Sequence, residues 1–189
     1  MRNEKKVSVY ARNSEGAVVV KEMHWGLIPA SFTGYVGDWG ASTAHARLET
    51  VATLPAFENA WKRKRRVIFP MNCYYEKASL GTATNGRKAK AERVAILRTD
   101  GKPMGVAGLY DHAQLMDGPL LSVAMLTREV GPRMAQFHDR EPLLLEPEDW
   151  DAWLSGSDSI DLETPWADDA FQVIPANSLK QRQAAGGLL

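Results

Sequence analysis

The stretch VSVYARNSEGAVVVKEMH, residues 7–24, decides the fold that we expect. Residues 7–12 and 17–24 are rich in Val and Tyr, residue types that favour strands. Between these two runs lie Asn13, Ser14, Glu15 and Gly16, which together favour a tight turn. The pattern predicts two antiparallel strands joined as a hairpin.

Further apolar runs predict the remaining strands. They lie at residues 67–70, 73–76, 93–99, 104–110, 120–127, 142–145 and 171–175. The runs 93–99 and 104–110 flank Asp100 and Gly101, so we expect them to pair as a second hairpin. A Gly-rich loop is expected over residues 31–42, and a polar surface loop over residues 79–90.

Three stretches favour helices instead. Residues 50–65 carry apolar side chains at near-helical spacing, with Pro55 in the first turn. A short helix is expected over residues 129–137. Another is expected over residues 147–154, where a Pro begins the segment and a Gly follows it.

The predicted strands outnumber the predicted helices, and they do not alternate with them as the strands of a parallel β-α-β sheet do. The predicted class is therefore α+β, with a largely antiparallel sheet. A length of 189 residues suits one domain, which we expect over residues 1–180, followed by a loose tail over residues 181–189.

The composition limits the possible functions. Lys plus Arg and Asp plus Glu both number 23, so a protein that coats nucleic acid by net charge is not indicated, and any DNA contact must be local. Cys73 is the one cysteine, which excludes an intrachain disulfide and a cysteine-based zinc site within these residues. We expect a cytoplasmic protein, without a membrane span.

Two local signals have a structural and a functional interpretation. The basic run Lys62 to Arg66 is more often a solvated end of a helix than a strip that faces phosphates. Trp25, followed by the turn-forming Gly26, is more often a core residue, but if exposed it could stack a nucleobase for about 1–3 kcal/mol.

Glu76 and His138 are the best acid–base candidates, because each follows an apolar stretch at a point where a side chain can face a cleft. The structural interpretation is a solvated Glu and a hydrogen-bonded His. The four histidines include no close pair at the spacing of zinc ligands, and no phosphate loop or dinucleotide fingerprint is present, so neither a metal nor a cofactor is expected.

The order of short motifs along the chain is more informative than any one of them. They are Trp25-Gly-Leu-Ile-Pro29, His45-Ala-Arg-Leu-Glu-Thr50, Val67-Ile-Phe-Pro70, Tyr74-Tyr75-Glu76, Ala107-Gly-Leu-Tyr110, Phe137-His-Asp-Arg140 and Glu148 to Leu154. Over roughly residues 17–176 this order resembles the SOS response-associated peptidase family, also called abasic-site processing proteins. The resemblance implies a barrel-like sheet with a few flanking helices.

The resemblance also implies a substrate and a chemistry. In the family, an N-terminal Cys reacts with the aldehyde of an abasic site in single-stranded DNA and closes a thiazolidine, a covalent crosslink. An α-amine with a pKa of about 8 is partly neutral and therefore nucleophilic at neutral pH. The implied partner is single-stranded DNA with abasic sites, bound by a monomer that would be nucleoid-associated while bound.

Site residues follow from the matching motifs. Glu76 matches a Glu that shuttles protons, and His138 matches a His that opens the sugar ring. Arg47 and Arg140 match arginines that hold phosphates. The remaining two matches are Trp25, on the rim that contacts DNA, and Thr127, beside the active-site His. The resemblance thus makes these segments the walls of one DNA-handling site.

Two departures from the family pattern matter. The chain begins Met1-Arg2-Asn3 where the family begins Met-Cys-Gly, so the crosslinking Cys is not at its expected place. Cys73 lies inside a strand region and cannot supply an N-terminal amine. His45 stands in place of a family Asn, and we count it among the catalytic candidates because imidazole can donate and accept hydrogen bonds.

Three hypotheses stay open from the sequence. The first is an abasic-site processing enzyme whose start is truncated here or which has lost crosslinking. The second is a non-catalytic relative that binds single-stranded or damaged DNA. The third is an unrelated hydrolase that uses Glu76, His138 and His45.

Overall fold

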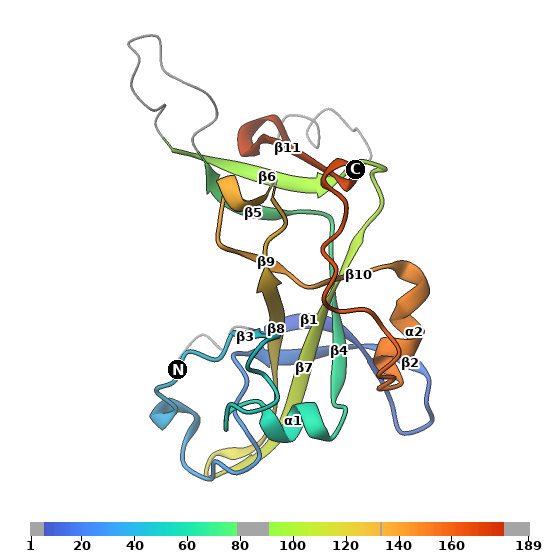
Figure 1. Ribbon diagram of the computed structural model, residues 1–189. Coiled ribbons are helices and arrows are strands. Elements are labelled where there is room, and N and C mark those ends of the chain that lie inside the picture. The colour runs from blue at the N-terminus through green and yellow to red at the C-terminus, as the bar shows by residue number, and fades with distance from the viewer. Residues whose placement is uncertain (1–5, 79–90, 133, 180–189) are drawn as a thin grey trace. The chain divides into compact units, whose positions relative to one another are not determined.

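The computed structural model describes residues 6–78, 91–132 and 134–179, which form two compact units (Figure 1). The first unit comprises Met1–Pro70, Gly105–Arg128 and Pro142–Glu163. The second unit comprises Met71–Met104, Glu129–Glu141 and Thr164–Leu189. The polar loop predicted over residues 79–90 and the tail predicted over residues 181–189 lie outside the described residues, and the domain boundary at residue 180 stays a prediction.

The first unit begins with the predicted hairpin. Strands β1 (Lys6–Arg12) and β2 (Val18–Trp25) pair antiparallel along their whole length, from Lys6 opposite His24 to Arg12 opposite Val18. Gly16 has a φ of 81°, a left-handed conformation that glycine adopts without strain. Asn13 accepts the backbone N–H groups of two turn residues through its side-chain oxygen, which closes the turn.

This hairpin is part of a closed ring of strands. The ring also contains β4 (Arg66–Met71), β7 (Met104–Leu115) and β8 (Gly118–Glu129). The strand order β10-β7-β4-β1-β2-β8-β3 closes because β7 also pairs with β8. The short strands β3 (His45–Arg47) and β10 (Leu144–Leu145) extend the path, and β9 (Arg140–Pro142) lies off it. Among the described pairings, β8 pairs in parallel with β2 and with β3.

The α+β class with a largely antiparallel sheet is therefore confirmed. A buried apolar cluster that includes Leu27, Ile68, Leu109 and Leu126 packs on the sheet together with residues of α1 and α2. Gly108 lies between the cluster residues Ala107 and Leu109 and therefore faces the other side of β7, where a Cβ would overlap the ring of Phe69.

The second unit is built on a three-stranded antiparallel sheet with the order β11-β6-β5. Its strands are β5 (Tyr74–Ala78), β6 (Glu92–Arg98) and β11 (Phe171–Pro175). The break between the predicted runs 67–70 and 73–76 is real, since β4 ends at Met71 before β5 begins. A small buried cluster of Ala95, Leu97 and Leu179 packs on this sheet.

The predicted hairpin between residues 93–99 and 104–110 is wrong. These residues lie in β6 and β7, which belong to different sheets. The end of β6 is instead held by the segment that leads into β11, because the Thr99 N–H donates to the Ala170 carbonyl at 2.8 Å. Asp100 and Gly101 form the expected turn, but the strand that follows it, β7, joins the larger sheet and does not pair with β6.

Two predicted helices are shorter than expected. Helix α1 covers only Glu58–Lys62, and residues 50–57 form successive turns, because Pro55 has no N–H for a continuous helix. In place of a helix over residues 129–137, β8 continues to Glu129 and only the 3-10 turn η2 (Met134–Gln136) follows. The expected helix over residues 147–154 is confirmed as η3 (Pro147–Asp149) and α2 (Trp150–Leu154).

A buried carboxylate positions the loop that follows β2. Asp111 of β7 is fully buried and forms an ion pair with Arg65. Its Oδ2 also accepts the backbone N–H of Ala30 at 3.0 Å and the side-chain amide of Asn59 at 3.3 Å. One carboxylate therefore links the sheet, helix α1 and the loop, and its several donors compensate for its removal from water.

Ser122 of β8 lies directly opposite Asp111 and holds the same loop. Its buried Oγ accepts the N–H of Ile28 at 2.8 Å and donates to the carbonyl of Ile28 at 3.3 Å. The loop residues next to Trp25 are therefore fixed to the sheet by side chains as well as by backbone bonds.

Replacing the buried carboxylate should destabilise the first unit. Asp111→Asn leaves Arg65 without its partner charge and is expected to lower the free energy of unfolding by roughly 3 kcal/mol. Urea denaturation followed by circular dichroism measures this value. Asp151→Asn is the matched control: its side chain is 80% exposed and pairs with Arg12, so less than about 1 kcal/mol should be lost. Equal stability of the two variants would contradict the role of Asp111.

Candidate nucleic-acid interface

Strand β3 presents two of the predicted site residues on one face. Side chains alternate along a strand, and here Ala46 is buried whereas His45 and Arg47 are exposed. β3 runs parallel to β8, with Arg47 opposite Thr127, and the Leu48 N–H donates to the Thr127 carbonyl at 2.8 Å. The structure thus places His45, Arg47 and Thr127 close together in the first unit.

Trp25 lies at the end of β2 beside this face. Its half-buried ring meets His45 and Phe69 edge to face, each with a centroid distance of 5.5 Å. The structure therefore supports both interpretations of Trp25, because one part packs on the core and another part reaches solvent.

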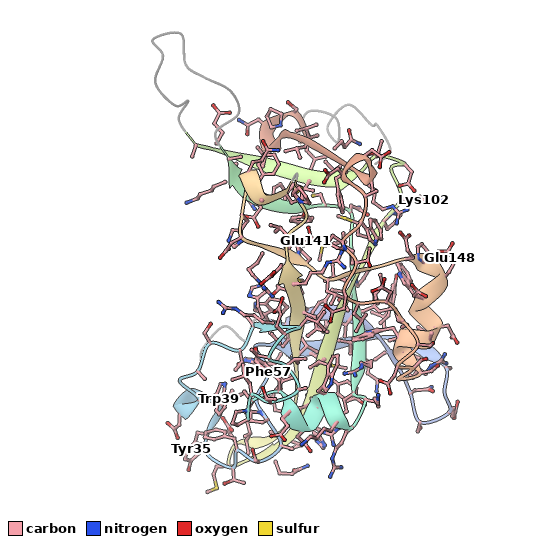
Figure 2. All side chains as sticks on the ribbon, in the orientation of Figure 1. Tyr35, Trp39, Phe57, Lys102, Glu141 and Glu148 are labelled. Atoms are coloured by element: carbon pink, nitrogen blue, oxygen red, sulfur yellow. The ribbon has the colours of Figure 1, made fainter. Side chains whose placement is uncertain are left out.

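A hollow of about 300 Å³ opens next to Trp25, and Trp39 is a second aromatic side chain in its wall. The Trp39 indole N–H donates to the Thr43 hydroxyl at 3.1 Å, and its ring packs on Phe32 with a centroid distance of 5.1 Å. Figure 2 shows Trp39 and Tyr35 on the loop that carries η1 (Val36–Asp38). The hollow has the aromatic lining that suits a planar ligand.

The pKa of His45 is lowered because the surrounding protein removes part of the imidazole from water, although the side chain still reaches solvent. A neutral imidazole both donates and accepts a hydrogen bond. His45 therefore resembles a family Asn in hydrogen-bonding capacity more closely than a charged His would.

The basic run from Lys62 to Arg66 is held by contacts within the protein. Each of its five cations has a partner within the first unit: Lys62 with Glu58, Arg63 with Asn59, Lys64 with Asp158, Arg65 with Asp111, and Arg66 with the rings of Trp61 and Trp153. Arg66 is almost fully buried, and desolvation lowers its pKa to about 10. The run is therefore no free strip for phosphates.

Glu76, in the second unit, lies in the middle of β5. Its backbone is opposite Val94 of β6, which is fully buried, and its own side chain is half-buried. A carboxylate in this position can exchange protons with a ligand while its strand keeps it in place.

His138 follows η2 and carries a side chain that is 48% exposed. Its Nδ1 accepts the backbone N–H of Arg140 at 2.9 Å, so the neutral imidazole has its proton on Nε2. The Asp139 carboxylate lies 2.9 Å from the same Nδ1 and would accept its proton in the charged form. Two polar groups of the following residues, the Asp139 carboxylate and the Arg140 N–H, therefore meet the same ring nitrogen of His138.

The predicted residues thus form two groups. Trp25, His45, Arg47 and Thr127 lie together in the first unit, whereas Glu76, His138 and Arg140 belong to the second. That both groups line one cleft stays a prediction.

The sequence reading missed three residues that shape the first group, namely Asp111, Ser122 and Trp39. The available signals were a charged and a hydroxyl side chain inside apolar strands, and an aromatic one in a Gly-rich loop.

The described residues offer neither a cluster of metal ligands nor a helix that could span a membrane. Within residues 6–78, 91–132 and 134–179, no three His, Cys, Asp or Glu side chains gather as ligands for a metal ion. In the same part of the chain, every helix is too short or too polar to cross a membrane.

The chain is similar in sequence to several abasic site processing proteins. That of Saccharomyces cerevisiae is 33% identical over 71% of this chain and 34% of the relative. YoaM of Bacillus subtilis is 30% identical over 71% of this chain and 56% of the relative, and YedK of Escherichia coli is 26% identical over 83% and 67%. The chain thus spans about a third to two thirds of the length of these relatives.

Solved structures share the fold. A crystal structure of a protein from Bordetella bronchiseptica has a TM-score of 0.78 at 25% identity, covering 93% of this chain and 86% of that one. A protein from Bacteroides thetaiotaomicron has a TM-score of 0.75 at 22% identity, covering 94% and 77%. The family described as SOS response associated peptidase matches residues 1–181. The chain therefore belongs to the SOS response-associated peptidase family.

Proposed function

We propose that the protein binds single-stranded DNA at abasic sites and processes them. The observation that carries this proposal is strand β3, whose alternation presents His45 and Arg47 on one face beside Trp25. A cation, an aromatic ring and a neutral hydrogen-bonding group are the three components needed to hold a phosphate, a base and a sugar.

The first unit would supply the affinity. Arg47 offers a planar guanidinium that can bind a phosphate through two parallel hydrogen bonds. The hollow beside Trp25 offers an aromatic wall to an unstacked base. Binding of DNA through Arg47 and the aromatic wall agrees with a formal net charge of zero, because it depends on a few side chains and not on the charge of the whole protein.

The second unit would supply the proton transfers. Attack of an amine on the aldehyde of an open abasic sugar forms a carbinolamine, and loss of water from it needs a proton donor. We assign this exchange to Glu76, ring opening to His138, and a phosphate contact to Arg140. The covalent crosslink of the family additionally needs the amine and thiol of an N-terminal Cys.

The alternative is binding without a bond. Cys73 favours it, because this side chain packs against the buried cluster of the second unit. In a gel assay with single-stranded DNA that contains an abasic site, a shifted band that survives denaturation supports covalent processing. A complex that dissociates in denaturant supports the binding function.

Removing the proposed proton carrier should separate chemistry from binding. Glu76→Gln keeps the shape of the side chain and is expected to slow abasic-site processing by about 100-fold, with DNA affinity within about twofold of the original. Single-turnover rates and fluorescence anisotropy measure the two quantities. Glu148→Gln is the matched control, as an exposed carboxylate in the first unit. Equal rates for both variants would rule out Glu76 as the proton carrier.

Truncating the proposed phosphate ligand should affect affinity. Arg47→Ala is expected to weaken binding of single-stranded DNA several-fold and to reduce the slope of log K against log salt by about 0.7, the value for one phosphate contact. Arg63→Ala removes a cation whose side chain already bonds Asn59, and should leave the slope unchanged. A similar loss from both changes would indicate a general effect of charge.

The lowered pKa of His45 should make stability depend on pH. The folded state resists protonation of this imidazole, whereas the unfolded chain takes up a proton at about pH 6.5. The free energy of unfolding should therefore fall as the pH drops through 6.5. His45→Gln should flatten this dependence in urea titrations between pH 5 and pH 8, and His112→Gln, which removes an exposed imidazole, is the control. An unchanged profile for His45→Gln would contradict the assignment.

A further inference from the structure

Neighbouring side chains of β5 point to opposite faces of the three-stranded sheet in the second unit. Glu76 lies on one face. Tyr75 and Lys77 lie on the other, together with Arg93 of β6, which is directly opposite Lys77 in the register. We call Tyr75, Lys77 and Arg93 the Tyr75 face, and the acid–base chemistry assigned to Glu76 makes no use of it.

The Tyr75 face contains a stacked aromatic platform. The guanidinium carbon of Arg93 lies 4.0 Å from the centroid of the Tyr75 ring, whose residue is 39% exposed. Cys73, two positions before Tyr75, packs against the buried cluster that contains Ala95 and Leu97. The ring and the guanidinium are therefore held on a packed base, and the outer side of the guanidinium can take one more planar group.

The charges of the Tyr75 face indicate an anion. Like charges directly opposite each other on paired strands are destabilising, yet Lys77 and Arg93 are such a pair, and both are exposed. Among the described residues, no carboxylate forms an ion pair with either of them. A negatively charged ligand between the two cations would remove the repulsion.

A groove of about 420 Å³ adjoins this pair and can hold a group the size of a nucleotide. Tyr75 and Arg93 line it on one side, and Pro175 and Asn177 on the other, with Glu92 also in the lining. The groove therefore combines an aromatic stack, the cation of Arg93 and an amide that can bond a base edge, and Lys77 lies next to Arg93 on the neighbouring strand.

We infer that the Tyr75 face binds one nucleotide of single-stranded DNA away from the abasic residue. A base stacks on the guanidinium of Arg93 above Tyr75, and a phosphate lies between Arg93 and Lys77. This inference deepens the proposed function and rests on it for the identity of the strand. It assigns to the second unit a contact with undamaged nucleotides, which every base can make because every base has a flat face.

The test uses the full chain and fluorescence anisotropy with labelled oligothymidylate, with and without one abasic site. Tyr75→Leu and Arg93→Ala should weaken binding of the undamaged oligonucleotide about five- to 100-fold, the range for loss of one stacked base. Arg93→Lys keeps the charge and loses the planar stack, so it should weaken binding and keep the salt slope. Lys77→Ala should reduce the slope by about 0.7.

Matched variants and a second ligand make the outcomes distinct. Tyr75→Phe keeps the ring, and Lys102→Ala removes an exposed cation elsewhere in the second unit (Figure 2), so both should bind like the original protein. Thymidine monophosphate should compete only at far higher concentration than the oligonucleotide. If thymidine monophosphate competes at the same concentration as the oligonucleotide, the Tyr75 face binds a free nucleotide and the inference that it binds a DNA strand is wrong.

The inference and the proposed function can fail separately. If the original protein prefers abasic DNA but Tyr75→Leu and Arg93→Ala bind undamaged DNA as Lys102→Ala does, the Tyr75 face is wrong and the function stands. If these variants lose affinity but the original protein shows no preference for an abasic site, the face is right and the function fails. Absence of all binding to single-stranded DNA overturns both.

Discussion

The arrangement of the first unit depends on the buried carboxylate of Asp111. An isolated charge in an apolar interior is strongly disfavoured, so this side chain is stable only while its donors surround it. Those donors come from three places: Arg65 after helix α1, Asn59 within that helix, and the backbone of Ala30 in the loop after β2. The requirement to satisfy one charge thus fixes three segments relative to the sheet.

The position of Trp25 depends on the loop after β2, which Asp111 holds against the sheet. The residues that follow it are bound to Ser122 and to the neighbouring strand, so the end of β2 has little freedom to move. Its indole is then held between Phe69 on the core side and His45 on the outer side. A binding group on a fixed element gives up little conformational entropy when a ligand arrives, which favours affinity from few contacts.

Much of this fold could be predicted because the signals were local. Turn residues next to β-branched runs located the β1–β2 hairpin, and alternation explains why His45 and Arg47 share a face. The pairing of β6 with β11 could not be predicted, because Arg98 and its partner Phe171 are far apart along the chain while the turn at Asp100 favours a neighbour. Local turn chemistry cannot reveal which of two sheets receives the next strand.

The residues that hold the loop escaped prediction for the same reason. The bond from Ala30 to Asp111 joins positions 81 apart in the chain, and a polar residue within a strand gives no sign of which backbone group will meet it. The basic run has both local and distant partners: Lys62 pairs with Glu58 one turn away, whereas Arg65 pairs with the distant Asp111, which the sequence could not reveal. Arg66, between two tryptophan rings, is the clearest case of a charge used for packing.

The brevity of β3 has a consequence for how the chain can vary. Its three residues carry the exposed His45 and Arg47 only because Ala46 faces inward. Adding or deleting one residue between them would place His45 and Arg47 on opposite faces, and shifting the whole strand by one residue would turn both side chains into the core. Changes of length in relatives should therefore accumulate in the loop before residue 44, where extra residues do not alter the alternation, and should avoid the strand itself.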